Sequence, residues 1–148
     1  MIASRVKMTT TVWRALFLVL GTLLPSQVLA AAPADANAEK VVQVTDDASL
    51  RLALRSVKPG TRIQIAPGRY KGGVSATELR GTKEQRITIE GSDARHPPLF
   101  EGGNEAWHLT DCAYLTLRNI AVKGQKHNGI NIDDGGTYDT PSQYIILD

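Results

Sequence analysis

Short runs in which two apolar residues flank a third residue recur along this sequence. They are Ile63-Gln64-Ile65, Ile87-Thr88-Ile89 and Leu115-Thr116-Leu117, with Ile145-Ile146-Leu147 as a candidate fourth run, and they start 24, 28 and 30 residues apart. Such alternation is typical of strands with one buried face. Recurrence at this period favours a solenoid whose coils stack like on like. An ordinary set of strands packed as a sandwich is the alternative.

The first thirty residues have the features of a secretory signal peptide. They contain three basic residues and no acidic one, and residues 15–24 are an apolar run too short to span a bilayer as a mature helix. Small residues precede a cleavage position after Ala30. We therefore expect a signal peptide at 1–30, a linker at 31–40 and a folded region at 41–148. This division predicts a secreted or periplasmic protein without a stable membrane anchor.

Charge and cysteine content narrow the class of protein further. Residues 31–148 contain 14 Lys and Arg against 15 Asp and Glu, so the basic character of the whole chain comes from the signal peptide. A nucleic-acid-binding footprint is therefore not expected. Cys112 is the only cysteine, which excludes an intrachain disulfide. We interpret it as a packed thiol, because no activating partner can be identified for a nucleophile.

An amphipathic helix is expected over residues 49–57, ahead of the first repeated strand. Asp46 and Asp47 suit the N-cap and the positive end of the helix dipole. The sequence Lys58-Pro59-Gly60 ends the helix. A solenoid exposes apolar residues at its ends, so this helix would cap the first coil. The residues on its apolar face are Leu50, Ala53, Leu54 and Val57.

Several segments resemble one group of secreted proteins. Residues 57–70 (VKPGTRIQIAPGRY) combine a helix end, Lys-Pro-Gly, a strand and Ala-x-Gly-x-Tyr. This run resembles the N-terminal cap and first coil of secreted right-handed parallel β-helix (pectate-lyase-like) proteins. Within them it is most similar to the N-terminal part of the alginate lyase and chondroitin lyase group. The resemblance covers residues 42–148 and continues through segments 48–50, 79–82, 86–91, 115–120 and 128–132.

The resemblance implies an all-β, right-handed parallel β-helix solenoid with an N-terminal capping helix. Three to four coils would follow Gly60, with Ile63, Ile87 and Leu115 on one internal ladder. Residues 144–148 look like a strand with nothing after it to cover its edge, and an open apolar edge is an aggregation hazard. We therefore expect a chain truncated at its C-terminus, or self-association through this open edge.

In the lyases that this chain resembles, the reaction is β-elimination beside a uronic acid. A cation or an arginine neutralises the carboxylate, and a lysine or similar base removes the neighbouring proton. No position here matches that lysine, that arginine or the calcium-binding acids. The resemblance thus implies a lyase-like polysaccharide-processing protein, with an acidic polysaccharide as partner and its catalytic coils outside this span. Calcium is implied by resemblance only. We predict that this span alone cleaves neither alginate, pectate nor chondroitin sulfate.

A second pair of runs, Trp107-His108-Leu109 and Ile130-Asn131-Ile132, starts 23 residues apart. If their apolar residues point inward, His108 and Asn131 point outward and stack one coil apart, with Asp133 nearby. This outer stripe could hydrogen-bond a sugar, and its alternative is a solvated sheet face. We name His108, Asn131 and Asp133 as candidate substrate-binding residues. No residue is named as catalytic, and the metal stays unknown.

Other conspicuous residues have structural interpretations. Asp133 and Asp134 would point to opposite faces of a strand, so a turn suits them better than an acid pair around one glycosidic bond. Tyr70 and Trp107 fit a core better than a sugar-stacking surface.

Two functional alternatives stay open beside the lyase-like interpretation. One is a non-catalytic carbohydrate-binding or surface β-helix, and the other is an inactive truncated product.

Overall fold

The computed structural model describes residues 40–136 and 138–148. The predicted signal peptide (1–30) and linker residues 31–39 lie outside the described residues, whereas Lys40, expected in the linker, already belongs to the first strand. In chain order the elements are β1 (Lys40–Val44), α1 (Asp47–Arg55), β2 (Thr61–Ile65), β3 (Arg69–Lys71), β4 (Val74–Thr77), β5 (Ile87–Gly91), β6 (Leu99–Glu101), β7 (Trp107–Thr110), β8 (Leu115–Arg118), β9 (Ala121–Lys123), β10 (Ile130–Asp133) and β11 (Ile146–Leu147).

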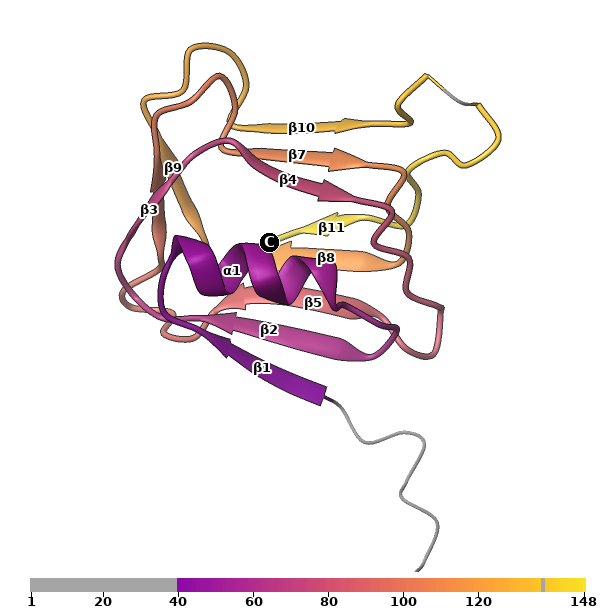
Figure 1. The fold of residues 1–148 in the computed structure, drawn as a ribbon, viewed down its shortest axis with the longest axis horizontal. Helices are drawn as coiled ribbons and strands as arrows, with labels where there is room; N and C mark the ends of the chain where they lie inside the picture. The colour runs from indigo at the N-terminus through magenta and orange to yellow at the C-terminus, as the bar shows by residue number, and fades with distance from the viewer. Residues whose placement is uncertain (1–39, 137) are drawn as a thin grey trace, which may run out of the picture. The chain divides into compact units, whose positions relative to one another are not determined.

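The strands form three parallel sheets that the chain visits in a constant order (Figure 1). Sheet A has the order β1-β2-β5-β8-β11, sheet B the order β3-β6-β9, and sheet C the order β10-β7-β4. From β2 onward the chain passes through sheets A, B and C three times and then returns to sheet A in β11. We call each passage a coil. The predicted mostly-β chain with parallel stacking is confirmed, and a sandwich of antiparallel sheets is excluded.

The strand register of sheet A differs from the predicted ladder. Ile63, Ile87 and Leu115 lie on adjacent parallel strands, and Ile87 pairs with Leu115 as predicted, but Ile63 pairs with Ile89. The predicted alignment of Ile63 with Ile87 is therefore wrong by two residues. A slip of two leaves every side chain on its original face, so hydrophobic alternation cannot distinguish the two registers.

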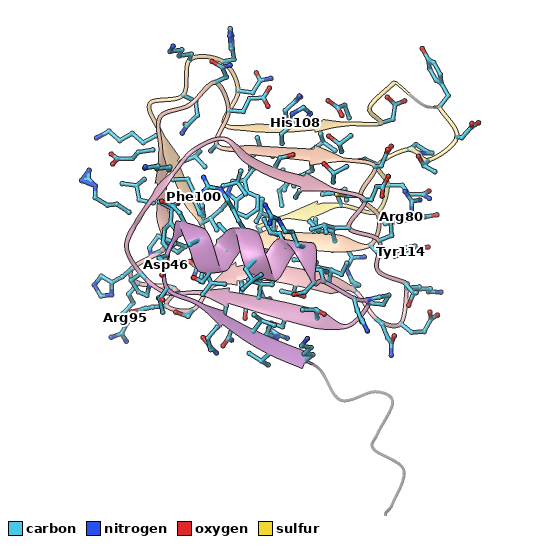
Figure 2. The ribbon with its side chains drawn as sticks, in the orientation of Figure 1. Asp46, Arg80, Arg95, Phe100, His108 and Tyr114 are labelled. Carbon is cyan, nitrogen blue, oxygen red and sulfur yellow. The ribbon has the colours of Figure 1, made fainter. Side chains whose placement is uncertain are left out.

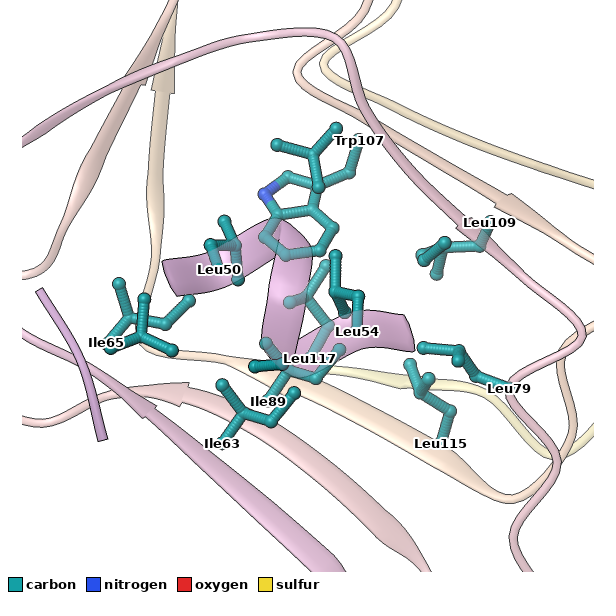
Figure 3. Packing of buried hydrophobic residues seen from close by; sticks show 14 of the residues in the cluster. Leu50, Leu54, Ile63, Ile65, Leu79, Ile89, Trp107, Leu109, Leu115 and Leu117 are labelled. Carbon is teal, nitrogen blue, oxygen red and sulfur yellow. The ribbon is translucent and has the colours of Figure 1, made fainter. Parts of the chain in front are cut away.

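The core lies in the space that the three sheets enclose. Ile63, Ile89 and Leu117 of sheet A and Trp107 of sheet C are fully or almost fully buried (Figure 3). Each such side chain contributes about 1.5–3 kcal/mol of hydrophobic stabilisation. The Trp107 indole nitrogen has no hydrogen-bond partner among the described residues. Cys112 is buried as predicted, and burial raises the pKa of its thiol, which suits a packing role.

Three aromatic rings contact one another in the core, with Tyr70 stacked on Phe100 of the next coil and Phe100 edge to face with Trp107. The ring centroid of Phe100 lies 5.2 Å from that of Tyr70 and 5.1 Å from that of Trp107. The Tyr70 hydroxyl donates to the Ala66 carbonyl at 3.0 Å. Tyr70 and Trp107 are therefore core residues, as predicted, and neither offers a ring face to a sugar.

Helix α1 begins two residues before the predicted helix and ends two residues before its predicted end. Asp46 is the N-cap: its carboxylate accepts from the Ser49 backbone at 2.7 Å, and the Ser49 hydroxyl accepts from the Asp46 backbone at 3.1 Å. The Ser49 backbone nitrogen and hydroxyl both donate to the Asp46 carboxylate, and these two bonds hold the pKa of Asp46 below its usual value. Leu50 and Leu54 are buried and point into the core (Figure 3), so α1 covers the core as expected of a capping helix.

Strand β11 is an edge strand of sheet A. Ile145, just before it, packs against the core, whereas Ile146 and Leu147 are 47% and 49% exposed. These residues form the apolar edge that the sequence predicted, and self-association through it stays a prediction. Within residues 40–136 and 138–148, no helix has the length and hydrophobicity that a membrane crossing requires.

Candidate binding site on sheet C

Two strands of sheet C bring the three predicted site residues together. Strand β10 pairs with β7 so that Asn131 lies opposite His108 and Asp133 opposite Thr110. Because Trp107 and Leu109 are fully buried, the alternate residues His108 and Thr110 face outward. Figure 2 shows His108 at the β7–β10 side of sheet C, whereas Phe100 points into the enclosed space. The predicted outer stripe therefore exists in the structure.

The side chains of this stripe contact one another through His108. Its Nε2 lies 2.6 Å from Asp133 Oδ2, and its Nδ1 lies 3.3 Å from Glu105 Oε2. The Asn131 amide nitrogen lies 3.4 Å from His108 Nε2 and donates to Asp133 Oδ2 at 3.3 Å. Both ring nitrogens thus face a carboxylate oxygen, and only a protonated imidazole can donate to both. We call Glu105, His108, Asn131 and Asp133 the histidine cluster.

Asp133 keeps its negative charge in this environment. The hydrogen bond from His108, followed by one from the Gly135 backbone at 3.1 Å, holds the pKa of the Asp133 carboxyl below its usual value. The next residue, Asp134, accepts from the Gly136 backbone at 2.8 Å. These bonds are typical of Asx turns, in which an aspartate side chain caps its own turn. The turn interpretation of Asp134 is therefore supported, while Asp133 also contacts His108.

Sequence reasoning missed three residues that contribute to this surface. Glu105 lies in the loop before strand β7, and its carboxylate contacts His108 Nδ1. Ser75 and Thr77 of β4 pair with His108 and Thr110, which extends the polar stripe to a third strand. The alternation in residues 74–77, Val-Ser-Ala-Thr, repeats that of β7 and was a signal that could have revealed them.

The described residues do not gather a metal site. Among them, no group of three or more His, Cys, Asp or Glu side chains is arranged to hold a metal ion. Of the remaining histidines, His96 contacts Asp93 at 2.9 Å in an exposed loop, and the backbone nitrogen of His127 donates to Asn104 in another loop. The described residues therefore contain no cluster of acidic and histidine side chains that could hold the calcium implied by resemblance.

A second charged cluster lies on the outer face of sheet A. Glu90 accepts from Arg62 at 2.9 Å, from Gln64 at 3.1 Å and from Arg118 at 2.7 Å. Arg118 and Glu90 thus form an ion pair. Burial alone would raise the pKa of the Glu90 carboxyl, but the hydrogen bonds from Gln64, Arg62 and Arg118 outweigh it and lower the pKa. This cluster is satisfied internally, which indicates a structural role.

Comparison with known proteins supports a lyase-like fold. No protein-family model matches this sequence, and no curated protein matches it. An alginate lyase from Paenibacillus sp. str. FPU-7 has a similar structure, with a TM-score of 0.51, 22% identity, and coverage of 73% of this chain and 36% of that chain. The PL6 family alginate lyase AlyGC aligns with a TM-score of 0.58 and 18% identity, over 72% of this chain and 14% of that chain.

An arginine-to-alanine mutant of AlyGC aligns over the same shares with a TM-score of 0.59. At these identities the likeness shows the fold alone, and this chain spans only 14% to 36% of the lyases it resembles. The predicted resemblance is therefore confirmed as a polysaccharide-lyase-like fold.

Proposed function

We propose that residues 40–148 belong to a right-handed parallel β-helix that binds an acidic polysaccharide on the outer face of sheet C. The observation that carries this proposal is the convergence of His108, Asn131 and Asp133, from two coils and in register, on one outward-facing surface. The structural likeness to alginate lyases supports a uronic-acid polymer as the ligand class.

The histidine cluster has the chemistry that sugar hydroxyls require. A carboxylate accepts, an amide both donates and accepts, and an imidazole can do either according to its protonation. Asp133 and His108 are each about two-fifths exposed at their side chains, so a ligand can reach both. The neighbouring hydroxyls of Ser75, Thr77 and Thr110 add further donors and acceptors on the same face.

The same cluster argues against cleavage by this span alone. β-Elimination needs a cation near the uronate carboxylate and a base near the adjacent proton. The histidine cluster contains two carboxylates, and no arginine or lysine of the described residues bonds to it. These carboxylates would repel a uronate carboxylate placed beside His108. We propose that β-elimination is the activity of a longer lyase-like protein and that it requires residues outside this span.

The test of binding uses purified residues 31–148 and calorimetric titration with alginate oligosaccharides. His108→Ala and Asn131→Ala should each weaken binding about tenfold, which corresponds to the loss of one or two hydrogen bonds. Gln43→Ala removes an outward amide from sheet A and is the matched control, with binding expected to be unchanged. Unweakened binding in both site variants would contradict the sheet C site. Absence of any binding by the wild type would favour the alternative of an inactive product.

The test of cleavage is an ultraviolet assay, because elimination creates an unsaturated sugar that absorbs. We expect no sustained rise in absorbance with alginate, pectate or chondroitin sulfate. A rise that is lost in His108→Ala or Asn131→Ala would show instead that the histidine cluster is catalytic.

We also propose that the protein is exported to the periplasm or the medium after cleavage behind Ala30. The basic and apolar pattern of residues 1–30 supports this proposal. N-terminal sequencing of exported protein should find Ala31 first. An intact Met1 terminus on cytoplasmic protein would contradict it.

A further inference from the structure

A groove of about 360 Å³ lies between helix α1 and strand β4, apart from the histidine cluster. Strand β4 is the edge of sheet C opposite β10 (Figure 1), so a groove lined by β4 lies at the other end of the same sheet. Its apolar part is contributed by Leu54 and by the buried residues of β4. The residues that line it are Arg51, Leu54, Arg55, Gly73, Val74, Ser75, Ala76 and Thr77.

The β4 side of the groove carries free peptide groups. The Val74 nitrogen donates to Ala106, and the Glu78 nitrogen donates to Thr110, so both point towards β7. In a parallel strand, alternate residues direct their N–H and C=O groups to opposite sides. Ser75 and Thr77 therefore direct theirs into the groove, where no described strand pairs with them. Their exposed hydroxyl groups add further polar atoms to this wall.

The α1 side of the groove carries two arginines without acid partners. Arg51 and Arg55 are four residues apart, so they lie on the same face of the helix. Neither side chain has a hydrogen bond or an ion pair with the described residues. By contrast, three arginines on sheets A and B each contact a glutamate within 2.9 Å, namely Arg62, Arg69 and Arg118. The two guanidinium groups of α1 are thus available to an external anion.

The groove and the histidine cluster lie on one continuous polar track. Ser75 of β4 pairs with His108, which pairs with Asn131 of β10. Thr77 of β4 pairs with Thr110, which pairs with Asp133 of β10. One end of the track therefore presents two cations and the other end presents two carboxylates. A polymer with both carboxylates and hydroxyls fits this distribution, because its carboxylates can contact the arginines while its hydroxyls contact the cluster.

We propose that the groove between α1 and β4 is a second subsite, which binds the carboxylate of a uronic acid residue and selects acidic over neutral polysaccharides. Arginine suits this task, because its planar guanidinium can hold a carboxylate through two parallel hydrogen bonds. An added peptide strand is less favoured, since charged side chains beside a free strand edge oppose strand addition. This inference rests on the proposed binding function and adds to it the place where the carboxylate is recognised.

The experiment is a nitrogen–proton NMR titration of residues 31–148 with an alginate tetrasaccharide and with neutral cellotetraose. The alginate probe should shift the backbone amides of Ser75 and Thr77, and the double variant Arg51→Gln, Arg55→Gln should bind it roughly tenfold more weakly. The affinity for cellotetraose should be the same in the double variant as in the wild type. Arg69→Gln is the matched control, because this exposed arginine already pairs with Glu101, and its affinity should stay within about twofold of the wild type.

The outcomes separate the two proposals. Wild-type affinity in the double arginine variant, together with weaker binding in His108→Ala, would overturn the groove and leave the sheet C site standing. Absence of alginate binding in the wild type would overturn both. If a glutamate-rich peptide shifts the amide signals of Ser75 and Thr77 and the alginate probe does not, the groove binds a peptide and the proposed uronate subsite is wrong. Thermal unfolding of each variant checks that any loss of binding is not a loss of fold.

Discussion

The outer faces of sheets A and C both carry polar ladders across parallel strands, but the central carboxylate is buried in one ladder and exposed in the other. On sheet A, Glu90 is 7% exposed and accepts hydrogen bonds from two arginines and a glutamine. On sheet C, Asp133 is more exposed and shares His108 with Glu105. Both carboxyl groups have lowered pKa values. Stacked coils can therefore use one strand geometry either to stabilise the fold or to present hydrogen-bonding groups to a ligand.

The largest expected effect is on stability, from Glu90→Gln. This change removes the carboxylate charge that Arg62 and Arg118 contact at the largely buried Glu90, and should lower the free energy of unfolding by about 1–3 kcal/mol. Urea unfolding measures it. Asp133→Asn is the control on sheet C and should change stability by less than about 0.5 kcal/mol. Equal losses in the two variants would mean that the faces do not differ in role.

The second effect concerns pH. The pKa of Glu90 is lowered in the folded protein, so its contribution to stability is full above the unfolded pKa of about 4.3 and is lost as pH falls through the folded pKa. Urea midpoints measured from pH 6 down to pH 3 should therefore fall less steeply in Glu90→Gln than in the wild type. Parallel curves for the two proteins would show that Glu90 does not contribute through its charge.

A smaller effect tests the histidine cluster directly. Replacing His108 with alanine removes the main cause of the lowered pKa of Asp133, so that pKa should rise towards its usual value. Carboxyl carbon NMR titration measures the change. Asp93 provides the matched control, because its pKa is lowered mainly by a hydrogen bond from His96. It should stay constant in His108→Ala and rise in His96→Ala, and any other pattern would contradict the assigned contacts.

The smallest expected effect concerns the last described strands of the two sheets. Strand β10 presents Asn131 and Asp133 outward, whereas β11 presents Ile146. We expect a polypeptide of residues 31–148 to associate weakly through β11, and Ile146→Lys to reduce this association by charging the edge. Ile145 is the wrong residue to change, because it packs against the core. Light scattering that finds a monomer before and after the change would refute the edge argument.

The sequence by itself determined which residues face inward and which face outward. Alternation with a period of two placed Trp107 and Leu109 in the core and His108 on the surface. The spacing of 23 residues between two such runs placed Asn131 one coil away, in register with His108. Local signals also located the capping helix, since Asp46 and Pro59 act through their immediate neighbours. Alternation along a strand and helix caps depend on nearby residues, so a sequence contains them.

Only the tertiary structure decided which outward and inward residues meet. The pairing of Ile63 with Ile89, the contacts of Glu90 with Arg62 and Arg118, and the approach of Glu105 to His108 all depend on how connecting loops turn. A slip of two residues keeps every face unchanged while exchanging every partner. The groove between α1 and β4 likewise arises from elements whose relative placement no local pattern specifies. Faces follow from local periodicity, whereas contacts follow from the long-range packing of successive coils.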